Sequence, residues 1–203
     1  MILKMKRIDF ENGSVTQNIF AAALPMLVAQ ILNLLYNIVD RIYIARIPHI
    51  GTAALGAVGL CFPLVVIIIA FANLFGSGGA PLFSISRGQK KNKQAVHIMN
   101  TSFTMVCFSA VVLMLIGLLF ARPLLILFGA SKDALVYAFP YMIIYLIGTL
   151  PSMIAIGMNP FINAQGYSTI GMFSVAIGAV ANLLLDPFFI FVLGFGAVSY
   201  THL

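Results

Sequence analysis

An aspartate stands inside one of the most apolar stretches of the chain, ANLLLDPFFIF, at residues 181–191. An ionised carboxylate near the bilayer centre costs at least about 2.5 kcal/mol, so such acids face a bundle interior or a wet cavity and mark ion or proton pathways. Asn182 precedes Asp186 by four residues and therefore shares its helical face. Pro187 follows directly, and its ring is expected to free the carbonyl of Leu183 beside the acid. A carboxylate, an amide oxygen and a loosened carbonyl are oxygen donors suited to a cation or a proton relay.

The same helical face continues toward the start of this segment. Ser174 and Gly178 precede Asn182 at four-residue steps and form a ladder of small and polar side chains with it. We expect Asp186 and Asn182 to bind a cation or a proton, and Ser174 to line the cavity beside them. The alternative is a buried aspartate that a neighbouring donor satisfies and that has no further role.

A second polar stripe follows an earlier apolar segment, VAQILNLLYNIVDRIYIAR, at residues 28–46. Its members recur at i, i+3, i+7 and i+10, within roughly 80° of the helix circumference. They are Gln30, Asn33, Asn37 and Asp40. Tyr36 borders the stripe and adds a hydroxyl group. Because a polar stripe on an apolar helix must face a partner helix or a cavity, we expect these residues to line a cavity, with Asp40 as a further cation or proton site.

Simpler roles stay open for this stripe. The three amides could make only interhelical hydrogen bonds. Asp40 lies near the end of its segment, where Arg41 or Arg46 could pair with it at the membrane interface.

The composition around these residues indicates the class of protein. Of 203 residues, 62% are hydrophobic and only 8% are charged, which is typical of an integral membrane protein. The net charge of +6 then reflects membrane topology rather than nucleic-acid binding. The sequence lacks a nucleophile–base set, a phosphate loop with a lysine and a Cys/His ligand spacing. These absences argue against an enzyme and against a Cys/His metal site.

Five apolar segments are long enough to cross a bilayer, which takes about 20 residues in a helix. They are residues 19–44, 55–75, 98–120, 134–158 and 170–193. A lipid-exposed backbone must satisfy its own hydrogen bonds, and no segment alternates like a barrel strand. We therefore expect an all-α integral membrane protein with five transmembrane helices. Prolines within the segments, among them Pro151 and Pro187, predict bent helices.

Positive charges distinguish the two ends of these helices. Three lie in the N-terminal tail and four in the loop SRGQKKNKQ at residues 86–94, against three on the other side. Cytoplasmic loops carry an excess of Lys and Arg, so the N-terminus and this loop are expected in the cytoplasm. The loop also suits contact with anionic membrane lipid.

Two local features have simple interpretations. The glycine-rich GSGGAP, at residues 76–81, is expected to close the second span as a tight turn rather than to bind phosphate. Cys61 and Cys107 lie in apolar segments and are expected to pack as small hydrophobic residues, without a disulfide.

Four motifs occur in the order found in a known family: ALPMLVAQILNLLYNIVDRIYIARI, GSGGAPLFSISRGQ, NPFINAQGYS and IGAVANLLLDPFFIF. They resemble the amino-terminal half of multidrug and toxin extrusion (MATE) transporters, nearest the MepA-like branch. The resemblance implies one of two six-helix lobes, and export of organic cations in exchange for H⁺ or Na⁺ across a bacterial plasma membrane. It also implies that Asp40, Asn182 and Asp186 form the cation or proton site of this lobe, with Pro187 as a helix kink.

Two features depart from the family pattern. Asn163 stands where many members carry an arginine, a change that the MepA-like branch accepts. Residues 198–203 do not resemble the family, so we expect residues 1–197 to be a partial amino-terminal lobe and residues 198–203 a tail from truncation or sequencing. The sixth helix and the carboxy-terminal lobe would then be missing.

The intact protein is therefore expected to be a cation-coupled antiporter of drug-like organic cations. It would need no cofactor beyond the coupling ion, and its partners would be membrane lipid and the carboxy-terminal lobe. A flippase of related fold for lipid-linked precursors is an alternative, but it should have a basic interior. A third possibility is a half-protein that packs in the membrane without transporting.

Overall fold

The computed structural model describes residues 8–9, 14–47 and 51–187, with side chains described up to residue 184. This part of the chain contains six helices and no strand. They are α1 (Val15–Ala45), α2 (Gly51–Gly88), α3 (Asn92–Leu127), α4 (Lys132–Ile147), α5 (Thr149–Ala164) and α6 (Ser168–Pro187). The prediction of an all-α membrane protein is confirmed for the described residues.

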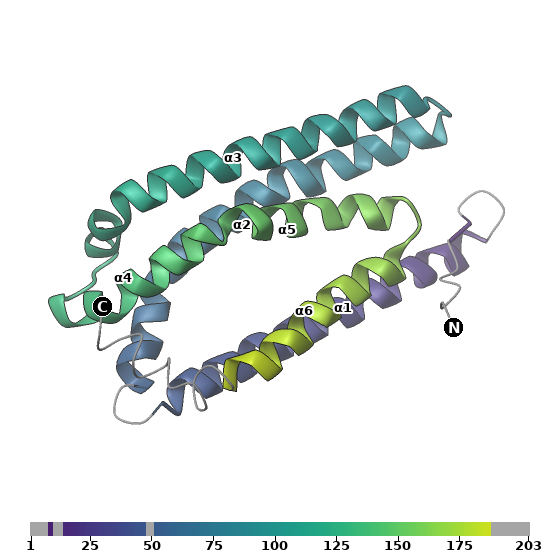
Figure 1. The fold of residues 1–203 in the computed structure, drawn as a ribbon. Coiled ribbons are helices and arrows are strands. Elements are labelled where there is room, and N and C mark those ends of the chain that lie inside the picture. The colour runs from purple at the N-terminus through teal and green to yellow at the C-terminus, as the bar shows by residue number, and fades with distance from the viewer. Residues whose placement is uncertain (1–7, 10–13, 48–50, 188–203) are drawn as a thin grey trace.

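The helices form two groups (Figure 1). Helices α2, α3, α4 and α5 pack against one another, while α1 and α6 lie side by side as a separate pair. The pair meets the larger group through α5 and α2. Because the turn from α5 to α6 reverses the chain, α6 runs in the same direction as α1.

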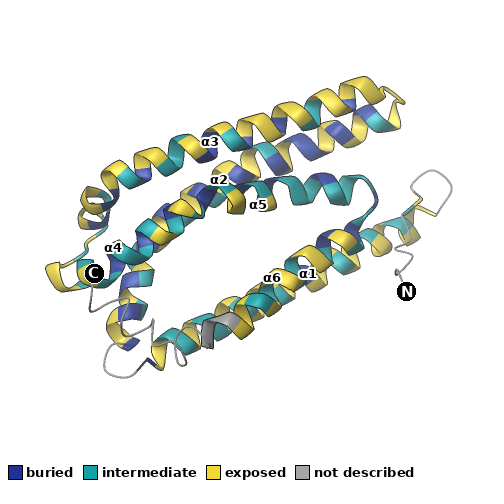
Figure 2. Cartoon of the chain, viewed as in Figure 1, coloured by how far each residue is buried: buried dark blue, intermediate teal, exposed yellow. Residues whose placement is uncertain are grey.

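The apolar core lies within the larger group. Its fully buried side chains include Cys61, Val106, Met142, Leu146 and Met153, which come from α2, α3, α4 and α5. Helix α1, in contrast, has one buried residue, Ala29. Figure 2 shows the same division, with buried residues concentrated along α2 and exposed ones along α1 and α6.

Three helices, α1, α2 and α3, are long and apolar enough to cross a membrane, and α4 with α5 makes a fourth span if the bent pair is counted as one. The predicted second and third spans, 55–75 and 98–120, lie within α2 and α3, and both helices continue beyond them at each end. Polar residues near the α2–α3 turn continue both helices beyond the apolar segments from which the spans were predicted. Helix α6 is a shorter apolar helix, and residues 188–193 of the predicted fifth span lie outside the described residues.

The prediction of a turn at residues 76–81 is wrong, because α2 passes through them as a helix. Two of these glycines serve packing instead. A Cβ atom on Gly76 would lie 2.7 Å from the Cα of Gly157 on α5, and one on Gly79 would lie 2.9 Å from the ring of Phe161. Glycines at such a crossing let two membrane helices approach closely. Composition alone does not separate this use from a turn.

The predicted fourth span, 134–158, is two helices in the structure. Helix α4 ends at Ile147, α5 begins at Thr149, and the pair is bent by 57°. Pro151 explains the break, because it has no N–H for the carbonyl of Ile147 and its ring clashes there. The expected bend is confirmed, and the boundaries are corrected to residues 132–164.

The turns gather at the two ends of the molecule (Figure 1). The start of α1, the α2–α3 turn with Lys90 and Lys91, and the α5–α6 turn lie at one end. The α3–α4 turn and the end of α1 lie at the other. The start of α1 and the α2–α3 turn thus share one end. The cytoplasmic side of that end stays a prediction.

The cysteines are free, as expected. Cys61 is fully buried, and its Sγ lies 3.5 Å from the carbonyl oxygen of Ala138 on α4, close enough for a weak hydrogen bond. It packs as a small core residue between α2 and α4.

Candidate functional site

The start of α1 is held beside the turn that leads into α6. The backbone N–H of Ile8 donates to the carbonyl of Gly166 at 3.0 Å, and the Asn18 side-chain amide donates to the carbonyl of Asp9 at 2.9 Å. Within α1, the hydroxyl of Ser14 caps the helix by accepting from the N–H of Gln17. These contacts bring the helices that carry the two candidate acids together from their first turns.

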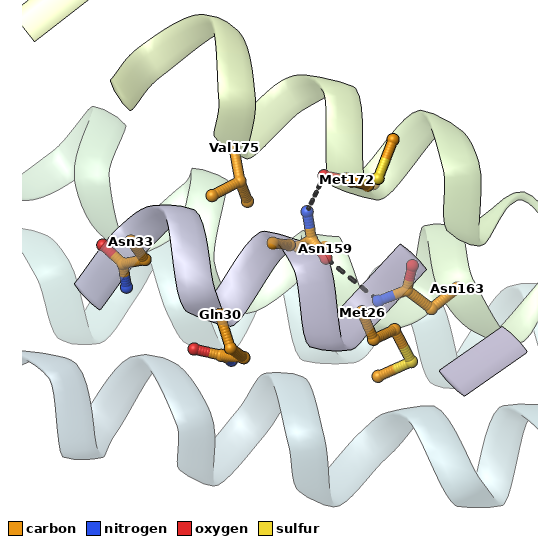
Figure 3. A pocket seen from close by; sticks show the side chains of 9 residues that line it. Met26, Gln30, Asn33, Asn159, Asn163, Met172 and Val175 are labelled. Carbon is orange, nitrogen blue, oxygen red and sulfur yellow. Dashed lines mark hydrogen bonds between the residues drawn. The ribbon is translucent and has the colours of Figure 1, made fainter. Parts of the chain in front are cut away.

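A cavity of about 100 Å³ lies where α1, α5 and α6 meet (Figure 3). Its lining combines carboxamides with small and apolar side chains. The lining residues are Met26, Ala29, Gln30, Asn33, Asn159, Asn163, Gly171, Met172 and Val175. Gln30 and Asn33 of the predicted stripe, which are both exposed, therefore border a polar cavity together with residues of α5 and α6.

Two asparagines of α5 form the other polar wall of this cavity. The side-chain amide of Asn159 donates to the carbonyl of Gly171 at 3.2 Å, and that of Asn163 donates to Oδ1 of Asn159 at 3.0 Å. Neither residue is among those predicted from the sequence to form the site. The available signal was their four-residue spacing in an apolar helix, which places both amides on one face.

The predicted stripe continues along α1 as an exposed face. Gln30, Asn33 and Asn37 also line a second, open hollow of about 380 Å³, together with Leu34, Ile38 and Arg41. The Asn37 amide donates to the backbone carbonyl of Asn33 at 2.7 Å and to its Oδ1 at 3.2 Å. Tyr36, which borders the stripe, is half-buried and has an interaction partner. Their role in binding a substrate stays a prediction.

Asp40 lies near the end of α1 and is half-buried. Its neighbour Arg41 places its guanidinium carbon 6.0 Å from the ring centroid of Phe62 on α2, within reach of a cation–π contact. This contact directs the arginine toward α2.

The predicted ladder on α6 faces away from close packing where it is described. Ser174 and Asn182 are exposed, and a Cβ atom on Gly178 would meet nothing within 4 Å. Asp186 and Pro187 form the last two positions of the helix, and their side chains lie outside the described residues.

The backbone register places the two candidate acids near one level. The cavity marks a common level at residues 26–33 of α1 and 171–175 of α6. Both helices run from there in the same direction with a rise of about 1.5 Å per residue, so Asp40 and Asp186 lie within about one helical turn of each other along the axis. Among the described residues, no group of three or more His, Cys, Asp or Glu could hold a metal ion.

Comparison with known proteins identifies the class. The MatE family model matches residues 25–188, most of the chain, and the chain therefore belongs to the MatE family. It is 25% identical over 182 residues to the multidrug export protein MepA of Staphylococcus haemolyticus, a match that covers 90% of the chain and 40% of that protein. It is 26% identical to an FAD transporter of Shewanella oneidensis, covering 85% of the chain and 37% of that protein.

The solved structures agree with this assignment. An outward-facing multidrug resistance MATE family transporter of the MOP superfamily superposes with a TM-score of 0.84 at 27% identity. The match covers 91% of the chain and 40% of that transporter. The chain thus has the fold of part of a MATE transporter, and it spans about 40% of the length of these relatives.

Proposed function

We propose that the chain is the amino-terminal part of a secondary active multidrug exporter in a bacterial plasma membrane, with its N-terminus in the cytoplasm. The MepA relative supports efflux of drug-like molecules. The excess of Lys and Arg in the N-terminal tail and in the loop at residues 86–94 supports the orientation. A second lobe would complete the transport pathway, as the partial coverage of the relatives suggests.

One observation carries the proposal: α1 and α6, the helices that contain Asp40 and Asp186, lie side by side and carry exposed polar side chains. Ionisable residues at such depth are costly and are retained where they serve ion or proton movement. Asp40 from α1, with Asn182 and Asp186 from α6, would bind H⁺ or Na⁺. The cavity-lining amides and Tyr36 would contact an organic cation.

The coupling follows from charge. Binding of H⁺ or Na⁺ neutralises the carboxylates, which allows α1 and α6 to repack and weakens the hold on a cationic drug. The ion must bind the two conformations with different affinity, because equal affinity shifts no equilibrium. Pro187 would ease this repacking at the end of α6, since proline removes a helix hydrogen bond.

Two other functions make different demands. A flippase for lipid-linked precursors should present a basic interior to a phosphate, whereas the described cavity between α1, α5 and α6 is lined by amides and apolar groups. A half-protein that only packs in the membrane would need no acid in α1 or α6.

The test replaces Asp186 and Asp40 singly by Asn and measures export of a fluorescent organic cation. It uses both the chain itself and a full-length relative with the equivalent changes. Asp133→Asn is the matched control, because Asp133 is an exposed acid in the first turn of α4. We expect loss of export in the two intramembrane variants and none in the control. Unchanged export in the full-length variants would remove the mechanism, and a chain that exports nothing alone would need its second lobe.

A further inference from the structure

The outward face of α3 is polar in the first turns of the helix. These turns pack on the larger group through buried residues, which are Ala95, Ser102 and Val106. The opposite face carries exposed polar side chains at steps of four, three and four residues, which are Lys93, His97, Asn100 and Thr104. Helix α3 packs on α2, α4 and α5 and lies on the side of the molecule away from the α1–α6 pair (Figure 1). The polar face is therefore turned outward.

The apolar part of the same face has the length of a membrane span. Beyond Thr104, exposed apolar side chains continue the row as far as the exposed Arg122. They are Phe108, Val111, Leu115 and Leu119. Thr104 and Arg122 are about 27 Å apart along the helix, close to the roughly 30 Å of a hydrocarbon layer. Lys93, His97 and Asn100 then lie on the headgroup side of the hydrocarbon boundary.

Exposed aliphatic side chains also occur near the α2–α3 turn, on α2. Leu82 and Ile85 are 56% and 57% exposed. A Cβ atom on Gly79 would clash with the hydroxyl of Ser102, so α2 and α3 are in close contact there and these two residues are level with the first turns of α3. Aliphatic side chains beside cations are typical of segments at the boundary between headgroups and acyl chains.

The turn between α2 and α3 concentrates positive charge. Its four cations lie within seven residues, and they are Arg87, Lys90, Lys91 and Lys93. The sequence has no Asp or Glu between Asp40 and Asp133, so no acid of α2 or α3 balances them. The guanidinium carbon of Arg87 lies 5.6 Å from the ring centroid of Phe83, which directs this side chain along α2. The three lysines are exposed and need a counter-charge from outside the two helices.

Lys90 adopts a backbone conformation that favours glycine. Among the described residues it is the one non-glycine residue with a positive φ, 59°. The N–H of Lys91 donates to the carbonyl of Ser86 at 2.9 Å and closes a Schellman turn around it. The equivalent turns after α3 and α5 have glycine at this position, Gly129 and Gly166. Strain of this kind persists where the side chain has a role, which here is its charge.

We propose that the end of α2 and the start of α3 form a binding surface for an anionic phospholipid. Lys90, Lys91 and Lys93 attract the phosphate, because lysines at a membrane surface favour anionic headgroups. The side chains of His97 and Asn100 donate hydrogen bonds to headgroup oxygens, and the acyl chains lie along the apolar row that starts at Phe108. A zwitterionic lipid gains less, because its own cation repels the lysines. This surface is independent of the ion that drives transport.

The test uses the absence of tryptophan from the chain, so that one introduced Trp reports the lipid beside it. Phe108→Trp lies on the apolar row directly below the polar face. Ile177→Trp is the matched control, since it is 69% exposed and α6 contains no basic residue. Each variant of the full chain is reconstituted in mixtures of phosphatidylglycerol and phosphatidylcholine, one of which has brominated acyl chains that quench tryptophan fluorescence. The quenching gives the relative binding constant of the two lipids at each position.

We expect a preference of at least about threefold for phosphatidylglycerol at position 108 and a ratio of about one at position 177. Lys90→Gly with Lys93→Gln should reduce the preference at position 108 to about one. Glycine suits the φ of residue 90, so this change preserves the turn. Lys132→Gln, which removes an exposed lysine at the other end of the molecule, should leave the preference unchanged.

Two results would overturn the proposal. One is an equal ratio at positions 108 and 177, and the other is a preference at position 108 that survives the loss of the lysines. Inorganic phosphate, added at constant ionic strength, tests for a soluble anion instead. A preference that it leaves unchanged supports the lipid, whereas one that it abolishes would assign the surface to a free anion and overturn the lipid.

Discussion

The larger group, which consists of α2, α3, α4 and α5, and the α1–α6 pair are built from the same apolar residue types but pack in opposite ways. In the first group, small residues bring backbones together, and Gly157 of α5 lies against Val106 of α3 and the backbone of Ala72 on α2. In the pair, α1 has one buried residue, Ala29, against twelve on α2. Large aliphatic side chains are exposed in both groups, among them Leu34 and Ile177 in the pair and Leu119 and Leu127 on α3. Close packing in a membrane therefore follows small residues rather than hydrophobicity.

The surroundings of polar side chains also differ between the larger group and the pair. Thr149, which is fully buried at the start of α5, donates its hydroxyl to the carbonyl of Tyr145. The amides of Gln30 and Asn33 on α1 instead border hollows. The core of the larger group is thus a dry scaffold, while the pair, together with the face of α5 that carries Asn159 and Asn163, has room for water, an ion or a substrate.

The largest loss of stability should come from placing a bulky side chain where α2 crosses α5. Gly76→Leu places a side chain against the backbone of Gly157, which cannot move aside, so we expect a loss of more than about 4 kcal/mol of stability. Gly78→Leu is the control, since a Cβ at that position meets nothing within 4 Å. Unfolding in a dodecyl sulfate titration, followed by far-UV circular dichroism, compares them. Equal stability would mean that the crossing is not close.

Creating a cavity in the core of the larger group should lower the free energy of unfolding by less than Gly76→Leu does. Leu146 is fully buried and packs against Gly117, so Leu146→Ala should lower the free energy of unfolding by about 3 kcal/mol. Ile144→Ala removes a comparable side chain that is 63% exposed on the same helix and should change stability little. The same titration measures both, and a cost at Ile144 as large as at Leu146 would place the core elsewhere.

Helix caps give the smallest expected effect and sharpen the comparison. Ser131 caps α4 in the scaffold and Ser14 caps α1 in the pair, each by accepting from a backbone N–H. Either change to Ala removes about 1 kcal/mol of cap energy. In Ser131→Ala the loss should appear in global unfolding, whereas in Ser14→Ala it should appear as faster amide hydrogen exchange confined to the first turns of α1. Global destabilisation by Ser14→Ala would contradict the division into scaffold and pair.

The sequence was sufficient for the helical class and for most of the apolar segments, because burial in lipid leaves the backbone few alternatives. The bend at Pro151 was predictable for the same local reason. The role of residues 76–81 was not, since Gly76 acts through contact with Gly157, a residue 81 positions later in the chain. The amides of Asn159 and Asn163 were missed because the contact that joins them to α6, from the Asn159 amide to the carbonyl of Gly171, comes from another helix. Asp186 lies in the last turn of α6, and its side chain lies outside the described residues.

The central claim is that ion binding at Asp40 and Asp186 loosens or tightens the α1–α6 pair while the scaffold stays fixed. Amide hydrogen exchange of the lipid-embedded chain, followed with and without Na⁺ and across pH with correction for the intrinsic exchange rate, tests it most directly. The account predicts changes in protection confined to α1 and α6 and abolished by Asp40→Asn or Asp186→Asn. Equal changes in the protection of α2, α3, α4 and α5, or changes in α1 and α6 that persist in both variants, would contradict it.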